Sequence, residues 1–142
     1  MPTQAHSNTP DETFKIGEKI GETLQGNEIV LLSGELGAGK TLMTKGIASA
    51  SGVDPDDVVS PTFTIMNRYE GKFPIFHIDL YRLGENLKSM KTGLPEIDDN
   101  IDEGVIVIEW AQFLPDLYFA LKNAVKVNIR VIDETTRHIH IS

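Results

Sequence analysis

Apolar residues near the start of the chain follow a helical spacing. They recur every fourth residue, at Ile16, Ile20 and Leu24, and this spacing places them on one face of a helix. Thr9 suits the N-cap of this helix, Pro10 suits its first position, and Glu12 completes a capping box. Gly26-Asn27 is predicted to end it. We therefore expect an amphipathic helix that covers one face of a sheet.

Later apolar runs are short and have the composition of strands. Glu28–Ser33 is the first of them. Val105–Ile108 consists of four consecutive β-branched residues, which predicts a buried parallel strand. Val125–Ile132 alternates apolar and polar residues, and we expect His138–Ser142 to return beside it as an antiparallel partner. Strands interleaved with helices indicate an α/β fold.

The middle of the chain reads as a hairpin followed by an irregular segment. An extended run ends near Tyr69, and the strand Pro74–Leu80 is predicted to return beside it. For residues 84–103 we expect short helices and an exposed loop. Residues 1–8 are polar and are expected to be frayed. No repeat or linker divides the sequence, so residues 1–142 are predicted to form one domain.

One motif, Gly34 to Thr41, dominates the chemistry. Its residues are Gly34, Glu35, Leu36, Gly37, Ala38, Gly39, Lys40 and Thr41. This is the full phosphate-binding loop pattern, and it lies between a predicted strand and a segment of helical composition, residues 42–50. The glycines allow backbone N–H groups to converge on an anion. Lys40 is expected to reach the phosphates and Thr41 to bind Mg²⁺, so the motif predicts a site for Mg²⁺ and a nucleoside triphosphate.

Two acidic residues follow apolar strands and are candidates for the rest of this site. Asp79 ends one predicted strand and Glu109 ends another. Ligands of open α/β sheets bind beyond the carboxyl ends of the strands. We expect one carboxylate to lie close to Mg²⁺ and the other to position the attacking water or to couple the site to a loop. Thr62, in a possible γ-phosphate-sensing loop, is a third candidate, although this segment also reads as a plain turn.

Two aromatic side chains near the acids each have more than one candidate role. Strand alternation places His77 on the same face as Asp79. His77 therefore either contacts the site or is a strand histidine satisfied by a neighbour. Trp110 is the single tryptophan and follows Glu109. It either stacks near the nucleotide, faces a partner, or belongs to the core.

Composition restricts the partners and the compartment. The net charge is −8, from 21 acidic and 13 basic residues, and no cluster of Lys and Arg stands out in the sequence. A protein that grips nucleic acid alone usually carries a basic patch, so any nucleic acid is expected to be reached through a protein partner. There are no cysteines. No apolar run would span a membrane, and no secretory signal is evident, so a cytoplasmic location is expected.

Four blocks of sequence carry a resemblance to a known family. They are the loop motif, Ser60-Pro-Thr-Phe-Thr64, His77-Ile-Asp-Leu-Tyr-Arg-Leu83 and Ile108-Glu-Trp110. In content, order and spacing they resemble the TsaE family (formerly YjeE), small P-loop ATPases of tRNA threonylcarbamoyladenosine synthesis. The similarity covers nearly the whole chain. It implies a single P-loop NTPase domain whose mixed, mainly parallel sheet is flanked by helices and carries antiparallel hairpins.

The resemblance also implies roles for individual residues. Lys40 and Thr41 would bind phosphate and Mg²⁺, Glu109 would be the Mg²⁺-linked acid, and Asp79 the acid needed for ATP hydrolysis. The other matching positions are Thr62 in the switch-like block, Thr13 and Arg137 near the nucleotide, and Trp110 beside the Mg²⁺-linked acid. Such proteins hydrolyse ATP weakly alone. They act with TsaD and TsaB, which would hold the tRNA while ATP hydrolysis resets the complex.

The sequence departs from the family pattern at two places. The family usually has a second Thr after Lys-Thr, where this chain has Leu42. Residues 86–102 also differ from the family's usual glutamate-rich helix, so partner contacts in this segment are not predicted.

Other function classes remain for comparison. A small GTPase is disfavoured because neither Asn-Lys-x-Asp nor Asp-x-x-Gly occurs in the sequence. A small P-loop kinase would need an Arg-bearing lid, and this chain has four scattered arginines. A nucleotide-gated binding module, whose turnover is incidental, is the third alternative.

Overall fold

The computed structural model describes residues 3–90 and 93–142, and in this part of the chain one sheet of seven strands forms the centre. The strand order is β1-β7-β6-β2-β5-β4-β3. The strands are β1 (Thr3–Ser7), β2 (Ile29–Gly34), β3 (Met66–Glu70), β4 (Pro74–Asp79), β5 (Val105–Glu109), β6 (Ala124–Val131) and β7 (Arg137–Ile141).

The middle of the sheet is parallel and both edges are antiparallel. Strand β2 pairs in parallel with β5 and β6, and β5 pairs in parallel with β4. Strands β3 and β4 form one antiparallel hairpin, β6 and β7 form another, and β1 adds to β7. The predicted parallel strand at Val105–Ile108 and the C-terminal hairpin are both confirmed.

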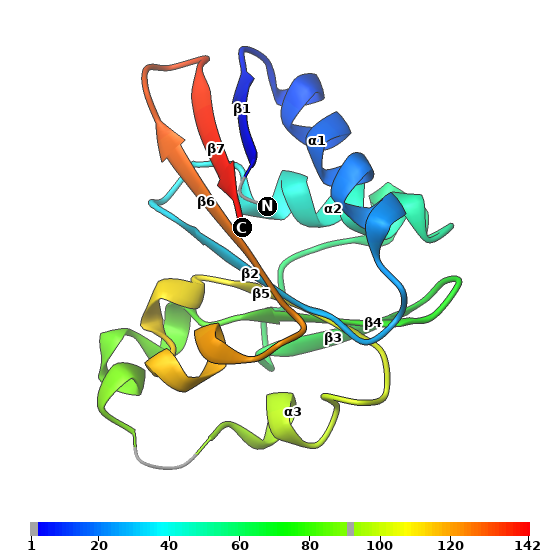
Figure 1. The fold of residues 1–142 in the computed structure, drawn as a ribbon, viewed down its shortest axis with the longest axis vertical. Helices are drawn as coiled ribbons and strands as arrows, with labels where there is room; N and C mark the ends of the chain where they lie inside the picture. Colours follow the sequence, from blue (N-terminus) through cyan, green and yellow to red (C-terminus); the bar gives the residue numbers. More distant parts are fainter. Residues whose placement is uncertain (1–2, 91–92) are drawn as a thin grey trace.

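Helices cover the two faces of the sheet unequally (Figure 1). Helix α1 (Pro10–Thr23) and helix α2 (Lys40–Ala50) lie together against one face, where Val30, Leu32 and Val107 are buried. The other face is covered by α3 (Pro95–Asp98) and by short 3₁₀ segments, over the buried side chains of Ile29, Leu31 and Ile106. The 3₁₀ segments are η2 (Tyr81–Leu83), η3 (Glu85–Ser89), η4 (Ala111–Phe113) and η5 (Asp116–Ala120), and η1 (Pro55–Asp57) follows α2. No helix among the described residues is long and apolar enough to cross a membrane.

The N-terminal segment differs from the sequence-based expectation. Residues 1–8 are expected to be frayed, but Thr3–Ser7 form edge strand β1, paired in register with β7. The Ser7 side chain is buried, and its Oγ bonds the Thr9 carbonyl at 2.8 Å and Thr13 Oγ1 at 2.6 Å. Backbone pairing and this buried hydroxyl hold a segment whose polar composition alone suggests disorder. The first two residues lie outside the described part.

The predicted helix start is confirmed, with one change in its capping. The Glu12 N–H donates to Thr9 Oγ1 at 3.1 Å. The Glu12 carboxylate reaches back to the N–H of Asn8 at 2.7 Å, one residue before the expected partner. Helix α1 ends at Thr23, three residues before Gly26. Residues 84–103 form η3 and α3 as short helices, except that residues 91–92 lie outside the description.

Glycine residues set the distance between α1 and α2. A Cβ added at Gly17 would lie 2.5 Å from the Met43 carbonyl oxygen, and one added at Gly46 would clash with the Phe14 carbonyl. The two backbones therefore approach more closely than larger side chains permit. This contact matters for the site because α2 begins at the phosphate-binding loop and α1 carries Thr13.

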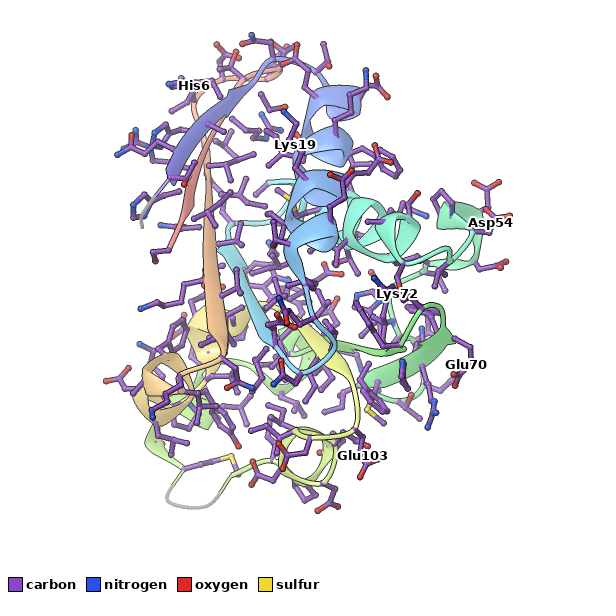
Figure 2. The ribbon with its side chains drawn as sticks, turned by 45° about the vertical axis from the view of Figure 1, so that its right-hand side comes forward. His6, Lys19, Asp54, Glu70, Lys72 and Glu103 are labelled. Atoms are coloured by element: carbon purple, nitrogen blue, oxygen red, sulfur yellow. The ribbon has the colours of Figure 1, made fainter. Side chains whose placement is uncertain are left out.

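We predict that Gly17→Ala lowers the free energy of unfolding by about 1–3 kcal/mol, the usual cost of overpacking a tight contact. Urea denaturation measures this. Lys19→Ala is the matched control on the same helix, because Lys19 is exposed on α1 (Figure 2), and its effect should stay within about 0.5 kcal/mol. Equal stability of the two variants would contradict the close helix contact.

Candidate functional site

The loop between β2 and α2 has the backbone that its glycines predict. Gly37 and Gly39 adopt positive φ angles of 78° and 111°, a conformation that L side chains rarely adopt. Gly39 is the N-cap of α2 and provides no side-chain cap. The first N–H groups of α2 are therefore open to an anion.

Lys40 is buried, and its ammonium group lies over the loop. Its Nζ donates to the carbonyls of Gly34 at 2.7 Å and Glu35 at 2.8 Å. It also lies 4.0 Å from the centroid of the Trp110 ring, a cation–π contact. Burial lowers the pKa of Lys40 below its ordinary value, while the nearby carboxylates of Glu109 and Asp79 oppose this shift. The loop thus holds a cation ready to exchange carbonyl partners for phosphate oxygens.

The two strand-end acids lie beside this loop. Asp79 and Glu109 are direct cross-strand partners in the parallel pair β4–β5. Glu109 is buried, and its Oε1 accepts a hydrogen bond from Thr41 Oγ1 at 2.8 Å. Asp79 is partly exposed, and its Oδ1 accepts from the N–H of Tyr81 at 2.9 Å. The structure therefore brings both acids to the residues that carry the phosphate-binding motif.

The environment of Asp79 raises the pKa of its carboxyl group. Burial is the main cause, and the neighbouring Glu109 carboxylate adds to it, while the hydrogen bond from Tyr81 opposes the shift. The two acids therefore occupy different settings. Glu109 is enclosed and hydrogen-bonded to Thr41, and Asp79 lies at the open side of the site.

His77 both contacts the site and is hydrogen-bonded to neighbours, the two alternatives that the sequence left open. It is fully buried, and its Nε2 lies 2.5 Å from Glu109 Oε2. Its Nδ1 lies 3.1 Å from the hydroxyl of Tyr69. His77 is therefore satisfied by neighbours, and one of these neighbours is the site carboxylate.

Trp110 packs at the edge of the site. It has a positive φ of 61°, unusual for a residue other than glycine. Its ring stacks on Phe113 with centroids 5.2 Å apart and tilts against Tyr81 at 4.9 Å. Trp110 also lines a cavity of about 340 Å³ together with Lys40, Thr41, Asp79 and Glu109. The tryptophan thus belongs to the wall of the site.

A second, smaller cavity lies on the other side of the loop and contains the two remaining residues that the resemblance points to. Thr13 and Arg137 both line this space of about 240 Å³ with Gly37 and Gly39. The Arg137 guanidinium donates to the carbonyl of Gly37 and, through Nε, to that of Ala38, both at 3.1 Å. Helix α1 and strand β7, from opposite ends of the chain, therefore meet at the loop.

Some predicted residues lie outside these two cavities. Thr62 is exposed, and its carbonyl accepts a hydrogen bond from Arg82; it lines neither of them. Ser60, two residues earlier, does line the larger one and lies 3.2 Å from Thr41 Oγ1. The Glu35 carbonyl accepts a hydrogen bond from Lys40, and Glu35 lines a third cavity together with residues of β6.

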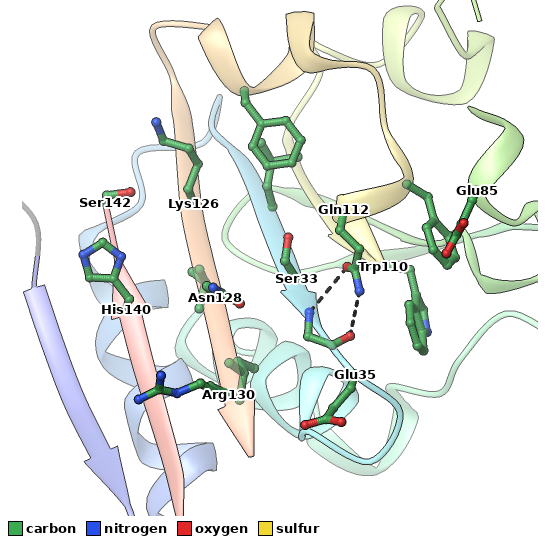
Figure 3. Close-up of a pocket in the computed structure, with 16 residues that line it drawn as sticks. Ser33, Glu35, Glu85, Trp110, Gln112, Lys126, Asn128, Arg130, His140 and Ser142 are labelled. Carbon is green, nitrogen blue, oxygen red and sulfur yellow. Dashed lines mark hydrogen bonds between the residues drawn. The ribbon is translucent and has the colours of Figure 1, made fainter. Parts of the chain in front are cut away.

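Gln112 is a contact residue that the sequence analysis missed. Its Nε2 donates to the Gly34 carbonyl at 2.9 Å, and its Oε1 accepts from the Gly34 N–H at 3.4 Å. Both bonds are drawn in Figure 3. The side chain therefore holds the first residue of the loop. Its position three residues after Glu109, in the turn that follows β5, was the available signal.

The cavity shown in Figure 3 is larger, about 670 Å³, but its chemistry differs. It lies on the face of the sheet opposite α1 and α2, between η4 and the exposed side of β6. Its charged residues carry both signs, Glu35 and Glu85 against Lys126 and Arg130. It shares Trp110 with the smaller cavity at Lys40, yet neither Lys40 nor Thr41 lines it. Its size therefore does not identify it as the phosphate site.

The side chains around Thr41 fit Mg²⁺ in their chemistry. Thr41, Ser60, Asp79 and Glu109 all present oxygen atoms, and Mg²⁺ prefers oxygen ligands. Within residues 3–90 and 93–142, no three His, Asp or Glu side chains gather as a metal site of their own.

The fold and this site define the class of protein. Strand β2 leads through the complete motif into helix α2, and the parallel strands β5 and β4 beside β2 each end in a carboxylate. This arrangement is that of a P-loop nucleotide-binding domain.

Comparison with known proteins identifies the family. The model of the family described as threonylcarbamoyl adenosine biosynthesis protein TsaE matches residues 7–139. The chain therefore belongs to the TsaE family.

Individual relatives agree with this assignment. The TsaE protein of Aquifex aeolicus is 36% identical over 135 residues, covering 92% of this chain and 89% of its own. The TsaE protein of Nostoc sp. is 34% identical over 134 residues, covering 93% of this chain and 80% of its own. The crystal structure of Bacillus subtilis YdiB superposes with a TM-score of 0.73 at 26% identity, over 99% of this chain and 84% of that one.

We predict that Lys40→Met changes the tryptophan emission of the protein, because Trp110 is the single tryptophan and loses the cation above its ring. Steady-state fluorescence measures the intensity and the emission maximum. Lys45→Met is the matched control on the same helix, since Lys45 Nζ bonds the carbonyls of Pro55 and Val58 instead. Emission from Lys40→Met that equals the wild type would contradict this contact.

Proposed function

We propose that this protein is an ATP-hydrolysing subunit required for threonylcarbamoyl modification of the adenosine beside the anticodon in tRNA. It would act with the pathway proteins TsaD and TsaB, and ATP hydrolysis would reset their complex between turnovers. Membership of the TsaE family supports the pathway. The site geometry supports the chemistry.

The observation that carries the proposal is the contact between Thr41 and Glu109. A P-loop hydroxyl and a strand-end carboxylate meet at 2.8 Å, with the Lys40 ammonium bonded to the same loop. These are the parts that hold Mg²⁺ and the β- and γ-phosphates in P-loop enzymes. Bound Mg²⁺ would neutralise charge that develops on the transferred phosphoryl group. Thr41 would be its direct protein ligand and Glu109 would hold it, directly or through water.

Asp79 would act on the attacking water. It lies opposite Glu109 on the neighbouring strand, is partly exposed, and lines the same cavity. The raised pKa of its carboxyl group makes it a better proton acceptor than an ordinary aspartate. Asp79 would therefore orient the water and accept its hydrogen bond, and Lys40 would stabilise the phosphate oxygens.

The cavity on the other side of the loop suits the nucleoside. Thr9, Thr13 and Thr135 border it with hydroxyl groups, and Arg137 borders it with its guanidinium group. A nucleotide whose phosphates lie on Gly37 to Thr41 would extend in this direction. ATP is the nucleotide that the family resemblance implies, and Thr13 and Arg137 are the residues that would contact it.

The charge of the chain favours an indirect contact with tRNA. A net charge of −8 opposes binding to a polyanion. TsaD and TsaB would then hold the tRNA, and this chain would supply nucleotide-dependent timing in the cytoplasm.

We predict that Lys40→Ala and Glu109→Ala each lower the modified nucleoside by at least about tenfold, because a lost hydrogen bond to a charged group costs about 1.5–3 kcal/mol. The assay is complementation of a bacterial strain depleted of its own TsaE, read by mass spectrometry of tRNA nucleosides. Lys15→Ala is the control, since Lys15 pairs with Asp11 at the surface of α1. Full modification with Glu109→Ala would contradict the hydrolytic role of this acid.

We also predict that purified TsaD and TsaB together raise the ATPase rate above that of the chain alone. The measurement is phosphate release with and without the pair. Binding of the pair would order the site residues that border its open side, Asp79 and Ser60. A rate unchanged by the pair would favour an independent small P-loop kinase or a binding module.

A further inference from the structure

A ring of hydrogen bonds, closed by the peptide bond between Val59 and Ser60, connects the site to residues outside it. Thr41 bonds Glu109 at 2.8 Å, and Glu109 bonds His77 at 2.5 Å. His77 meets the hydroxyl of Tyr69 at 3.1 Å. The Tyr69 hydroxyl lies 3.0 Å from the Val59 carbonyl oxygen and accepts a hydrogen bond from the Val59 N–H at 3.2 Å. The next residue, Ser60, closes the ring at 3.2 Å from Thr41.

The available protons fix the direction of most of these bonds. A carboxylate only accepts, so the Thr41 hydroxyl and His77 Nε2 both donate to Glu109. Because the single hydroxyl proton of Thr41 is then used, Ser60 must donate to Thr41. The Tyr69 proton has two acceptors, His77 Nδ1 and the Val59 carbonyl. That carbonyl also accepts from Asn67 Nδ2 at 3.0 Å, so it keeps a partner whichever way the tyrosine proton points.

The ring joins a rigid element to a segment without regular structure. His77 and Glu109 are buried on the adjacent strands β4 and β5, and Tyr69 is buried on β3. Residues 58–65 belong to no helix or strand. Arg82, three residues after Asp79, also bonds the carbonyl of Thr62 in this segment. The backbone N–H of Asp79 donates to the carbonyl of Ile65 at 2.9 Å, so the segment is tied to site residues near both of its ends.

We propose that His77 and Tyr69 are positioning residues, which lock Glu109 toward Thr41 and couple the order of residues 58–65 to occupation of the Mg²⁺-nucleotide site. The inference rests on the proposed ATP site and adds a path by which that site controls a neighbouring surface. The buried imidazole holds one carboxylate oxygen, so that the other is aimed at the loop. A shift of Thr41 on nucleotide binding would then displace Ser60 directly. A shift of Glu109 would displace Val59 through His77 and Tyr69.

The first arm of the test needs no nucleotide. Tyr69→Phe removes one hydroxyl and should raise amide hydrogen exchange at Val59 by about fivefold, the equivalent of one neutral hydrogen bond. Tyr118→Phe is the matched control, because Tyr118 is also buried and its hydroxyl bonds the Leu94 N–H and Asp98, away from the loop. An exchange rate at Val59 that is equal in the two variants would overturn the proposal.

The second arm measures ATP binding by Trp110 fluorescence, once with Mg²⁺ and once with EDTA. Tyr69→Phe and His77→Phe should weaken binding by about fivefold or more in Mg²⁺ and leave binding in EDTA close to that of Tyr118→Phe. His77→Gln should restore part of the loss, since its amide N–H can donate to Glu109 as the imidazole N–H does. Equal losses with Mg²⁺ and with EDTA would indicate a general structural role and would overturn the proposal.

The two arms separate this inference from the proposed function. If the wild-type protein bound no ATP in Mg²⁺, the proposed function would fail, while the exchange at Val59 would still decide whether the ring tethers the segment. If the wild type bound Mg²⁺-ATP normally and Tyr69→Phe behaved as Tyr118→Phe in both arms, the ring would carry no coupling and only this inference would fail.

Discussion

The parallel register of β2, β5 and β4 is the constraint on which the site depends. Leu32 pairs with Glu109, and Glu109 pairs with Asp79. Because the strands run in the same direction, their carboxyl ends meet at one edge, and the loop begins there at Gly34. A shift of one residue in either pairing would turn Glu109 or Asp79 to the opposite face of the sheet.

The loop itself is held by residues that are far away in the sequence. Gln112 binds Gly34 from the turn after β5, and Arg137 binds Gly37 and Ala38 from β7. Thr13 contacts the loop from α1, with its Cγ2 3.3 Å from the position that a Cβ on Gly39 would take. The close glycine contact between α1 and α2 makes this approach possible. A short loop rich in glycine thereby obtains a defined shape without bulky side chains of its own.

Much of this arrangement was readable from the sequence because it depends on local patterns. The motif at Gly34–Thr41, the β-branched run at Val105–Ile108 and the acids after the strands each carry their signal within a few residues. Other features depend on contacts between distant residues. Strand β1 has no apolar pattern and exists because β7 offers it an edge. Tyr69 and Ser60 join the site through tertiary contacts with His77 and Thr41, which no spacing along the chain encodes. Within residues 60–64 the sequence points to Thr62, whereas the residue that lines the cavity is Ser60, with its Oγ 3.2 Å from Thr41 Oγ1.

A crystal structure with Mg²⁺ and a non-hydrolysable ATP analogue would decide whether the loop and the two strand-end acids form one Mg²⁺-nucleotide site. We expect phosphates on the backbone N–H groups of Gly37 to Thr41, with Lys40 moved from the Gly34 and Glu35 carbonyls onto phosphate oxygens. We also expect the ion between the Thr41 hydroxyl and Glu109, with Asp79 facing the γ-phosphate. A nucleotide bound instead in the cavity beside β6, with Lys40 still on the carbonyls of Gly34 and Glu35, would show that these residues do not form the site.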